Sequence, residues 1–251
     1  MKNNLKRIGM VGGLAWPSTI DYYRLLCQRT NDHFRKQGAE LPYPTPPMVI
    51  ESVNIAETRP MRGEEGNDNS WRAFDNFFRE TLSALQRAGA DFGFIASNTP
   101  HMRFDAITEG VDLPLVSILD TTAAAVAGTG ANRALVLGTP VTMRSDAYPR
   151  ALERNGIRAL ASVPEETIVE LADLIDVDLY QGRIEGASEK IAEISRRHLL
   201  DDRVDIVCLA CTELPLAFPE HSNDAIFVED GITYINTTVA HVEAVLELAL
   251  S

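Results

Sequence analysis

Apolar residues along this chain occur in short runs that alternate with helix-like segments. The runs at 8–11, 48–53 and 134–137 are bounded by Gly, Pro or polar residues, which is typical of buried strands. Residues 71–88 instead repeat apolar side chains at helical spacing, and Gly89 follows as a helix-ending residue. This alternation predicts an α/β fold whose mostly parallel sheets are covered on both faces.

The rest of the chain continues the alternation, and its polar segment 54–70 predicts a mobile loop. Two similar strand ends, near residues 97 and 211, indicate two α/β units. We place the first domain at 1–115 plus 215–251 and the second at 116–214. The further elements expected are helices over 18–34 (with Ser18 as N-cap), 145–155, 165–181, 186–200 and Thr237 to Leu250, and strands over 115–118 and Val204 to Ala210.

Composition and charge narrow the function classes. The net charge of -13 argues against nucleic acid and anionic membranes as partners, because both require a basic face. A small anionic substrate remains compatible, provided that a local pocket supplies hydrogen-bond donors. No apolar run reaches transmembrane length, and the first residues lack the apolar core of a signal peptide. Three sparse cysteines do not form a disulfide framework, so we expect a cytoplasmic protein.

Two segments of the chain have the same pattern of residue types. Residues 91–101 read DFGFIASNTPH and residues 205–215 read DIVCLACTELP. Each has Asp, a mostly apolar run and Ala, followed by a nucleophile-type residue, which is Ser97 in one and Cys211 in the other. Ligands of open α/β sheets bind at the carboxyl ends of the strands. The pair therefore indicates one reaction centre approached from two sides.

The residues at these two strand ends could have purely structural roles instead of catalytic ones. Backbone N–H groups of a following turn would lower the pKa of Cys211, and Glu213 could hold a proton beside it, but a free cysteine is often only a buried structural residue. Ser97, Asn98 and Thr99 offer donors to a carboxylate, yet all three are also good helix N-caps. Cys208 and Cys211 lie three apart in or beside a strand with no second pair, so no metal site is expected.

Other polar residues are weaker candidates. Gly138-Thr139 follows a strand as a donor-rich turn, whereas Gly12-Gly13 matches no nucleotide-binding pattern. Arg59 and Arg62 are either carboxylate clamps or solvated loop residues. Of the five histidines, His101 is expected to line the pocket of Ser97 and His241 to pack inside a helix interface, while the remaining ones are expected at the surface: His33, His198 and His221.

Five motifs together resemble the aspartate/glutamate racemase superfamily, in particular its aspartate racemase branch. They cover nearly the whole chain and read IGMVGGLAWPSTIDYY, FIASNTPH, VLGTPVTM, LACTELPLAF and TTVAHVEA. The Cys-Thr-Glu within the fourth motif is similar to that of the aspartate branch, since glutamate racemases of cell-wall synthesis usually carry Cys-Thr-His.

The resemblance implies two pseudo-symmetric Rossmann-like domains with the active site between them, a homodimer and no cofactor. It also implies that two cysteines act on opposite sides of the substrate Cα, one removing a proton and the other returning one. Cys211 matches the second cysteine, with Glu213 beside it, and Ser97 stands in the place of the first. The substrate-binding residues implied are Asn98, Thr99, Thr139, Thr212, Trp16, Asn54 and, as a loose match, Arg59.

The sequence departs from the family pattern most clearly at Ser97. An alkyl hydroxyl has a pKa roughly 6–7 units above that of a thiol, a gap on the order of 9 kcal/mol, so a lone Ser cannot replace a thiolate. Ser97 is then either a Cys→Ser change made to trap substrate, or native to an enzyme that deprotonates from one face, or native to one-cysteine chemistry such as that of decarboxylase relatives. Asn54 and Asn236 also stand where relatives often have Asp.

The sequence leaves three functions open. The first is racemisation of aspartate or glutamate, impaired or one-sided because of Ser97. The second is a one-cysteine isomerase or decarboxylase of a small dicarboxylate. The third is an inactive binding protein for an acidic metabolite.

Overall fold

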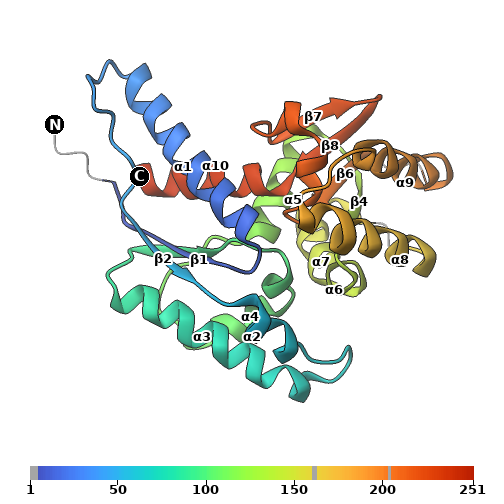
Figure 1. Ribbon diagram of the computed structural model, residues 1–251, viewed down its shortest axis with the longest axis horizontal. Helices are drawn as coiled ribbons and strands as arrows, with labels where there is room; N and C mark the ends of the chain where they lie inside the picture. Colours follow the sequence, from blue (N-terminus) through green and yellow to red (C-terminus); the bar gives the residue numbers. More distant parts are fainter. Residues whose placement is uncertain (1–4, 160–162, 203–204) are drawn as a thin grey trace. The chain divides into compact units, whose positions relative to one another are not determined.

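The protein forms two compact units in the computed structural model, which describes residues 5–159, 163–202 and 205–251 (Figure 1). The first unit contains Met1–Val116 and Val242–Ser251, and the second contains Ser117–His241. The expected α/β class with parallel sheets is confirmed in both units.

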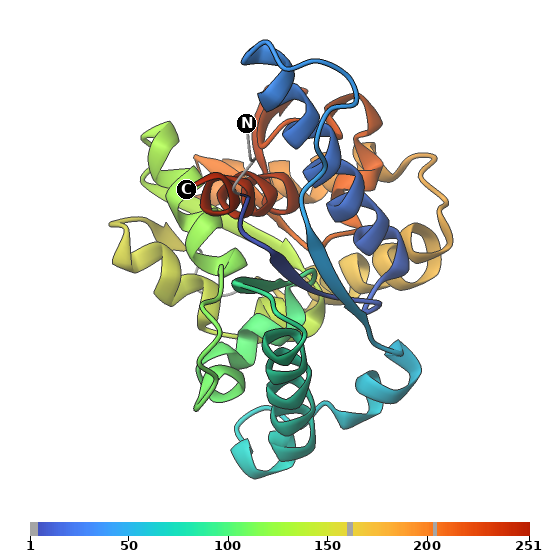
Figure 2. The ribbon, with the colours of Figure 1, turned by 90° about the vertical axis from the view of Figure 1, so that its left-hand side faces the viewer.

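The first unit is built on a parallel sheet with the order β2-β1-β3 among the described strands. Helix α3 lies along one face of this sheet, and α1 and the end of α10 lie on the other (Figures 1 and 2). Its elements are β1 (Ile8–Gly12), α1 (Trp16–Lys36), β2 (Met48–Ser52), α2 (Ile55–Thr58), the 3-10 turns η1 (Arg59–Met61) and η2 (Asp68–Trp71), α3 (Arg72–Arg87), β3 (Phe92–Ile95), the 3-10 turn η3 (Thr99–Arg103) and α4 (Phe104–Thr108).

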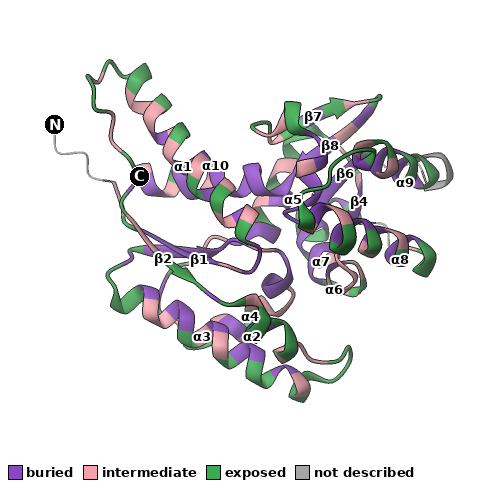
Figure 3. Ribbon diagram, in the orientation of Figure 1, coloured by how far each residue is buried: buried purple, intermediate pink, exposed green. Residues whose placement is uncertain are grey.

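Burial explains why β1 is the central strand of this unit. All five of its residues are buried, whereas β2 at the edge is mostly exposed (Figure 3). Gly9 allows α3 to pack closely, since a Cβ there would come within 3.0 Å of Ala90 and 3.2 Å of Leu85. Gly13 turns the chain at the carboxyl end of β1 with φ +84°, and a Cβ there would lie 2.1 Å from the carbonyl oxygen of Val53.

The second unit contains a sheet with the order β5-β4-β6-β8-β7 among its described strands, parallel except for the antiparallel edge strand β7. Its elements are α5 (Ile118–Thr129), β4 (Arg133–Gly138), α6 (Pro140–Arg144), α7 (Ala147–Arg154), β5 (Arg158–Ala159), α8 (Glu165–Asp173), a π-helical turn η4 (Leu174–Asp178), the 3-10 turn η5 (Leu179–Gln181), α9 (Ala187–Asp202), β6 (Ile206–Ala210), the 3-10 turns η6 (Leu214–Ala217) and η7 (Pro219–His221), β7 (Ile226–Glu229), β8 (Ile232–Asn236) and α10 (Thr237–Leu250), whose last turns belong to the first unit.

Alternate residues of the central strands β4 and β6 define the core of the second unit. Leu135, Leu137, Val207 and Leu209 belong to one buried cluster together with apolar residues of α8, α9 and the turns that follow α8. The period of two in this set follows from strand geometry, which sends successive side chains to opposite faces. Cys211 belongs to the same cluster, while Cys208 does not.

Several expected elements differ from the observed ones. The strand expected at 115–118 is reduced to a bridge between Leu115 and Gly93, because the Ala-rich run from Ile118 begins a helix instead. Ser18 is not the cap of α1, since the helix already begins at Trp16 and Pro17 fits its first turn. The polar segment 54–70 contains α2, η1 and most of η2.

Other elements were predicted correctly, and some observed elements were not predicted. The helix expected from Thr237 to Leu250 has those bounds, and α3 lies within one residue of the expected range at each end. The strand expected from Val204 is observed from Ile206, and Val204 itself lies outside the described residues. The further helices and strands that were not predicted are α4, α5, α6, β5, β7 and β8.

The return of the chain to the first unit also differs from the expected position. The second unit continues to His241, whereas we expected residues 215–251 in the first domain. The reason is strand pairing, because β8 adds in parallel to β6 and β7 adds to β8. Only the last turns of α10 join the first unit, where Ala249 accepts a hydrogen bond from the backbone N–H of Lys6.

Candidate active site

Cys211 lies directly after β6, the middle strand of the five-stranded sheet. Its side chain is buried, and its thiol donates a hydrogen bond to Oε2 of Glu213 over 2.9 Å. The hydroxyl of Thr212 donates to the same oxygen over 3.2 Å. The second strand end therefore forms a compact acid–base group in which the Glu213 carboxylate accepts from two neighbouring side chains.

The surroundings of Cys211 raise the pKa of its thiol well above the ordinary value. Burial is the main cause, and the nearby negative charge and hydrogen-bonded carboxylate of Glu213 add to it, with a further contribution from Asp176. The backbone N–H of Glu213 acts in the opposite direction but is outweighed. The expectation that backbone donors would lower this pKa is therefore wrong, because burial and the Glu213 carboxylate dominate. At rest the thiol holds its proton.

Strand pairing brings further polar residues to the edge where Cys211 lies. Gly138 of β4 pairs with Ala210 of β6, so Thr139 and Cys211 both follow paired positions at the carboxyl ends of neighbouring parallel strands. Thr139 caps α6, where its hydroxyl accepts from the backbone N–H of Thr142. Thr139, Cys211 and Thr212 therefore lie at one edge of the sheet in the second unit.

Residues that the sequence analysis did not single out support this edge. The hydroxyl of Thr237 donates to the carbonyl oxygen of Leu209 over 2.8 Å, which fixes the end of β6. Tyr148 is fully buried, and this burial raises the pKa of its hydroxyl, while Thr122 and Thr237 act in the opposite direction. Neither these contacts nor the effect of Asp176 on Cys211 is signalled by a local motif, because all depend on tertiary packing. Burial also raises the pKa of Cys208 to about 12.

Ser97 follows β3 in a tight turn of the first unit, where its backbone N–H donates to the carbonyl of Ile95. Asn98 and Thr99 beside it are buried. The ring of His101 lies 2.8 Å from the Ser97 carbonyl oxygen through Nδ1, and because a carbonyl only accepts, Nδ1 carries the proton. Within the described part of the first unit, no side chain hydrogen-bonds the Ser97 hydroxyl.

The remaining candidates of the first unit follow the carboxyl ends of its other strands. Gly12 pairs with Ser52 and Val11 with Ile95, so the turns after β1, β2 and β3 share one edge of the sheet. Four candidates lie on the chain that follows β1 and β2: Trp16, Asn54, Arg59 and Arg62.

These four residues differ in their exposure and in the hydrogen bonds that they make within their own segment. Trp16 opens α1 and is 66% exposed. Asn54 caps α2, since its Oδ1 accepts from the backbone N–H of Ala56 and its Nδ2 donates to Glu57, each over 3.0 Å. Arg59 is exposed, whereas Arg62 is partly buried. Asn54 therefore has a structural role whether or not it contacts a substrate.

The histidines outside the candidate site have structural positions. His198 was expected at the surface but is buried, with Nε2 3.5 Å from the hydroxyl of Thr167. It lies on α9, the helix that covers the core cluster, and this location explains the difference. His221 is partly exposed and stacks on Phe227, and Asp224 raises its pKa. His241 is buried in α10, as expected for a packing residue.

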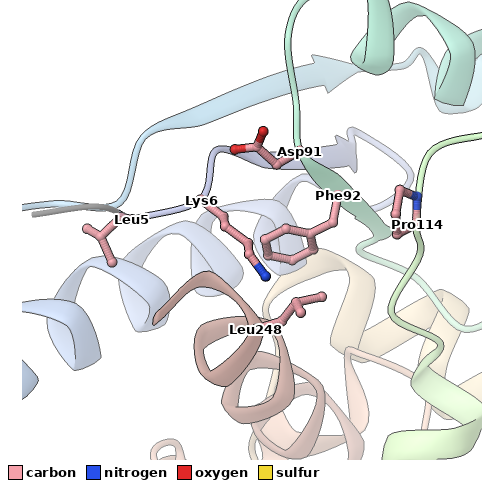
Figure 4. Close-up of a pocket in the computed structure, with 6 residues that line it drawn as sticks. All are labelled: Leu5, Lys6, Asp91, Phe92, Pro114 and Leu248. Atoms are coloured by element: carbon pink, nitrogen blue, oxygen red, sulfur yellow. The ribbon is translucent and has the colours of Figure 1, made fainter. Parts of the chain in front are cut away.

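A pocket of about 310 Å³ in the first unit is not the candidate site (Figure 4). Its lining residues Lys6 and Asp91 precede β1 and β3, so the pocket lies at the amino ends of these strands, while Ser97 follows a carboxyl end. Over the described ranges, no group of three or more His, Cys, Asp or Glu side chains is placed to hold a metal ion. No helix in the same part of the chain is long and apolar enough to cross a membrane.

Comparison with known proteins agrees with the sequence motifs. The family model of Asp/Glu/hydantoin racemases matches residues 11–245. The crystal structure of an aspartate racemase homologue from Pyrococcus horikoshii superposes with a TM-score of 0.75 and 28% identity over 98% of this chain and 100% of that chain. An aspartate racemase from Picrophilus torridus has the same fold, with a TM-score of 0.70, 22% identity, and 97% and 94% of the two chains covered.

Curated relatives match over a shorter range. A glutamate racemase from Listeria monocytogenes is 30% identical over 145 residues, which are 56% of this chain and 52% of the relative. The chain thus spans about half the length of the curated relatives it matches. A match of the family model to nearly the whole sequence nevertheless decides the family: the chain belongs to the Asp/Glu/hydantoin racemase family.

Proposed function

We propose that this protein is a cofactor-independent isomerase of the amino-acid racemase type that acts on aspartate or a similar acidic amino acid, such as glutamate. The observation that carries the proposal is the buried hydrogen bond between the Cys211 thiol and the Glu213 carboxylate. It supplies a sulfur acid–base group at a strand end, in a chain of a racemase family. In this proposal the catalytic residues are Cys211 and Glu213.

The first chemical step uses both groups of the pair. The Cys211 thiol gives its proton to Oε2 of Glu213, which already accepts its hydrogen bond, and the resulting thiolate removes the proton from the substrate Cα. The C–H electron pair remains on the substrate as a carbanion adjacent to the carboxylate. Return of the proton from the same sulfur gives back the original enantiomer, so inversion needs a second proton donor on the opposite face.

Ser97 is the residue that the family resemblance places in that second role. Its hydroxyl makes no hydrogen bond to a described side chain of the first unit, and an alkoxide lies on the order of 9 kcal/mol above a thiolate at neutral pH. We therefore expect one-sided proton exchange at Cα, with inversion slow or absent.

Substrate binding in this proposal depends on local donors, because the chain as a whole carries a net charge of -13. Backbone N–H groups and hydroxyl or amide side chains at the strand ends suit the carboxylates of a small acidic amino acid or dicarboxylate. The residues proposed to contact the substrate are Asn98, Thr99, Thr139, Thr212, Trp16, Asn54 and Arg59. We further propose that the protein acts as a homodimer in the cytoplasm, and light scattering of the purified protein tests the dimer.

A second candidate function is favoured by Ser97 itself. With one thiol in the proposed site, the same scaffold suits an isomerase or decarboxylase that needs a single proton donor for a small dicarboxylate. Decarboxylation releases CO2 and leaves a carbanion, which the Cys211 thiol would protonate. An inactive binding protein is the third possibility, and it would leave the Cys211–Glu213 pair without a chemical role.

Incubation with L- and D-aspartate in heavy water separates these functions. The proposed enzyme incorporates deuterium at Cα of one enantiomer faster than of the other and inverts it slowly or not at all. Loss of carboxylate from an aspartate-like dicarboxylate supports the decarboxylase instead. Binding without exchange or CO2 release supports the binding protein and contradicts the proposal.

A further inference from the structure

Arg103 joins three segments of the first unit through one guanidinium group. It is the last residue of η3, the 3-10 turn that follows Ser97 and Asn98. Its Nε and Nη2 donate to the two carboxylate oxygens of Asp75 on α3 over 3.2 and 2.7 Å, and its Nη1 donates to Asp68 of η2 over 2.5 Å. Its Cζ also lies 5.6 Å from the ring centroid of Trp71.

The burial of this group distinguishes it from a surface ion pair. The Asp75 side chain is 8% exposed and the Arg103 side chain 18%, whereas Asp68 is 91% exposed. Two-point hydrogen bonding between a guanidinium and a carboxylate fixes distance and orientation together, and a lysine cannot reproduce it. The Asp75 contact therefore holds η3 firmly against α3, while the Asp68 contact adds a weaker, solvent-exposed link.

The segment that Arg103 contacts is closed by its own hydrogen bonds. The Ser70 hydroxyl accepts from the backbone N–H of Glu64 over 2.8 Å and donates to the carbonyl of Asn67 over 2.6 Å, and Trp71 Nε1 donates to the carbonyl of Glu64 over 3.1 Å. A Cβ on Gly63 would lie 2.4 Å from Ser70 and 2.5 Å from Trp71. Residues 63–71 thus form a compact turn directly after Arg62.

We propose that Arg103 is a positioning residue that sets the geometry of substrate binding in the first unit. On one side it fixes the closed turn 63–71, from which the segment carrying Arg59 and Arg62 extends. On the other it holds η3, whose residue His101 bonds the Ser97 carbonyl. One group thereby fixes the spacing between the arginine segment and the Ser97–Thr99 turn. This role rests on the proposed function, because both segments are assigned to substrate binding there.

The test compares Arg103→Lys with Arg79→Lys. Arg79 lies on α3 and donates to the carbonyl of Ala106, so it links α3 to α4, and its hydrogen bonds within the described part of the chain do not reach residues 63–71. We expect Arg103→Lys to speed amide hydrogen exchange in 63–71 and 97–103 and to weaken aspartate binding about tenfold. The Cα deuterium exchange rate at saturating aspartate should stay within about twofold of the parent rate, because Arg103 touches no reacting atom. Arg79→Lys should change neither binding nor exchange in these two segments.

Asp68→Asn serves as a second variant in case Arg103→Lys does not fold, since Asp68 is almost fully exposed. For Asp68→Asn, a smaller increase of amide hydrogen exchange in 63–71 and 97–103, together with weaker aspartate binding, supports the proposal. Unchanged amide exchange in Arg103→Lys, or faster amide exchange with unchanged aspartate affinity, overturns it. If the parent protein binds no acidic amino acid, the proposed function fails, and the hydrogen-exchange comparison still decides whether Arg103 fixes the two segments.

Discussion

The thiol of Cys211 and the carboxylate of Glu213 form a buried hydrogen-bonded pair, with 2.9 Å between Sγ and Oε2. Two residues apart in sequence, they meet because the chain turns immediately after β6, at Cys211 and Thr212, before η6 begins. In such a pair the carboxylate raises the pKa of the thiol and also accepts its proton. Glu213 thus adds to the burial that keeps Cys211 protonated at rest, and in the proposed mechanism it accepts the proton when the thiol becomes a thiolate.

Removal of the Glu213 charge tests this double role. Glu213→Gln should lower the pKa of Cys211, although burial keeps it above the ordinary value. The pH profile of Cα deuterium exchange should shift to lower pH, and the maximal rate should fall about tenfold or more because the proton acceptor is gone. Exchange measured between pH 6 and 10 checks both effects. A profile that coincides with that of the parent would show that Glu213 does not tune the thiol.

Substitution of Cys211 tests whether it is the group that reacts. Cys211→Ala should abolish Cα exchange, since no other described side chain at this sheet edge carries a thiol. Cys208→Ala is the matched control: Cys208 lies within β6, three positions before Cys211, and burial alone raises its pKa to about 12, so it lacks a carboxylate acceptor such as Glu213 provides for Cys211. The mechanism is wrong if Cys211→Ala retains parental exchange, or if only Cys208→Ala loses it.

The same pKa shift makes a prediction for stability against pH. The pKa of Cys211 is higher in the folded protein than in the unfolded chain, so its contribution to stability is complete below the unfolded pKa and is lost as pH rises above it. Above about pH 8.5 the parent should lose about 1.4 kcal/mol per pH unit relative to Cys211→Ser, whose hydroxyl does not titrate. Urea unfolding from pH 7 to 10 measures this difference. Parallel curves would contradict the buried, protonated thiol.

The positions of the two strand ends were predicted correctly from the sequence, whereas the direction of the Cys211 pKa shift was not. Ser97 and Cys211 follow β3 and β6 as expected, because short apolar runs bounded by polar turns identify buried parallel strands. The direction of the Cys211 pKa shift was wrong, since it depends on burial and on where the Glu213 carboxylate points, which no local pattern contains.

The elements and contacts that were not predicted from the sequence have a similar cause. Strand β8 alternates apolar and polar residues weakly, and only its pairing with β6 assigns residues 215–241 to the second unit. The buried position of His198 likewise depends on how α9 packs. The guanidinium of Arg103 reaches Asp75 from 28 residues away, so sequence spacing alone gives no sign of the contact. Long-range contacts of this kind need a folded chain to be seen.

The segment 54–70 is predicted to close over the substrate. Residues 63–71 are fixed by Ser70 and Trp71, and Arg59 is exposed on η1, so we predict that α2 and η1 carry the contact with the substrate. Arg59→Gln should raise KM for aspartate several-fold with little change in kcat, and less if Arg62 is the main contact. Arg72→Gln removes a similar charge from the exposed surface of α3 and should leave KM unchanged. Unaltered kinetics in Arg59→Gln, Arg62→Gln and the double variant would rule out the clamp.

The last prediction concerns Ser97 and two-way racemisation. Ser97→Cys replaces one oxygen by sulfur in a turn where the backbone, not the hydroxyl, makes the observed hydrogen bonds: the Ser97 N–H to Ile95 and the His101 ring to the Ser97 carbonyl. Packing should therefore change little, while a thiol, whose ordinary pKa is about 8.5, is introduced as an acid–base group. Asn98, Thr99, Cys211 and Thr212 are already present for the remaining contacts.

The optical rotation of L- and D-aspartate over time, with the parent and with Ser97→Cys, checks this prediction. We expect the parent to bind aspartate and exchange one enantiomer without appreciable inversion, and Ser97→Cys to invert both. The matched control is Ser97→Ala, which should behave as the parent does, because the hydroxyl of Ser97 is assigned no proton transfer. If the parent racemises as fast as Ser97→Cys while Ser97→Ala does not, the Ser97 hydroxyl is itself activated, and the one-sided mechanism is wrong. If none of the three inverts or exchanges any acidic amino acid, the decarboxylase and the binding protein become the better explanations for a chain with this single cysteine–glutamate pair.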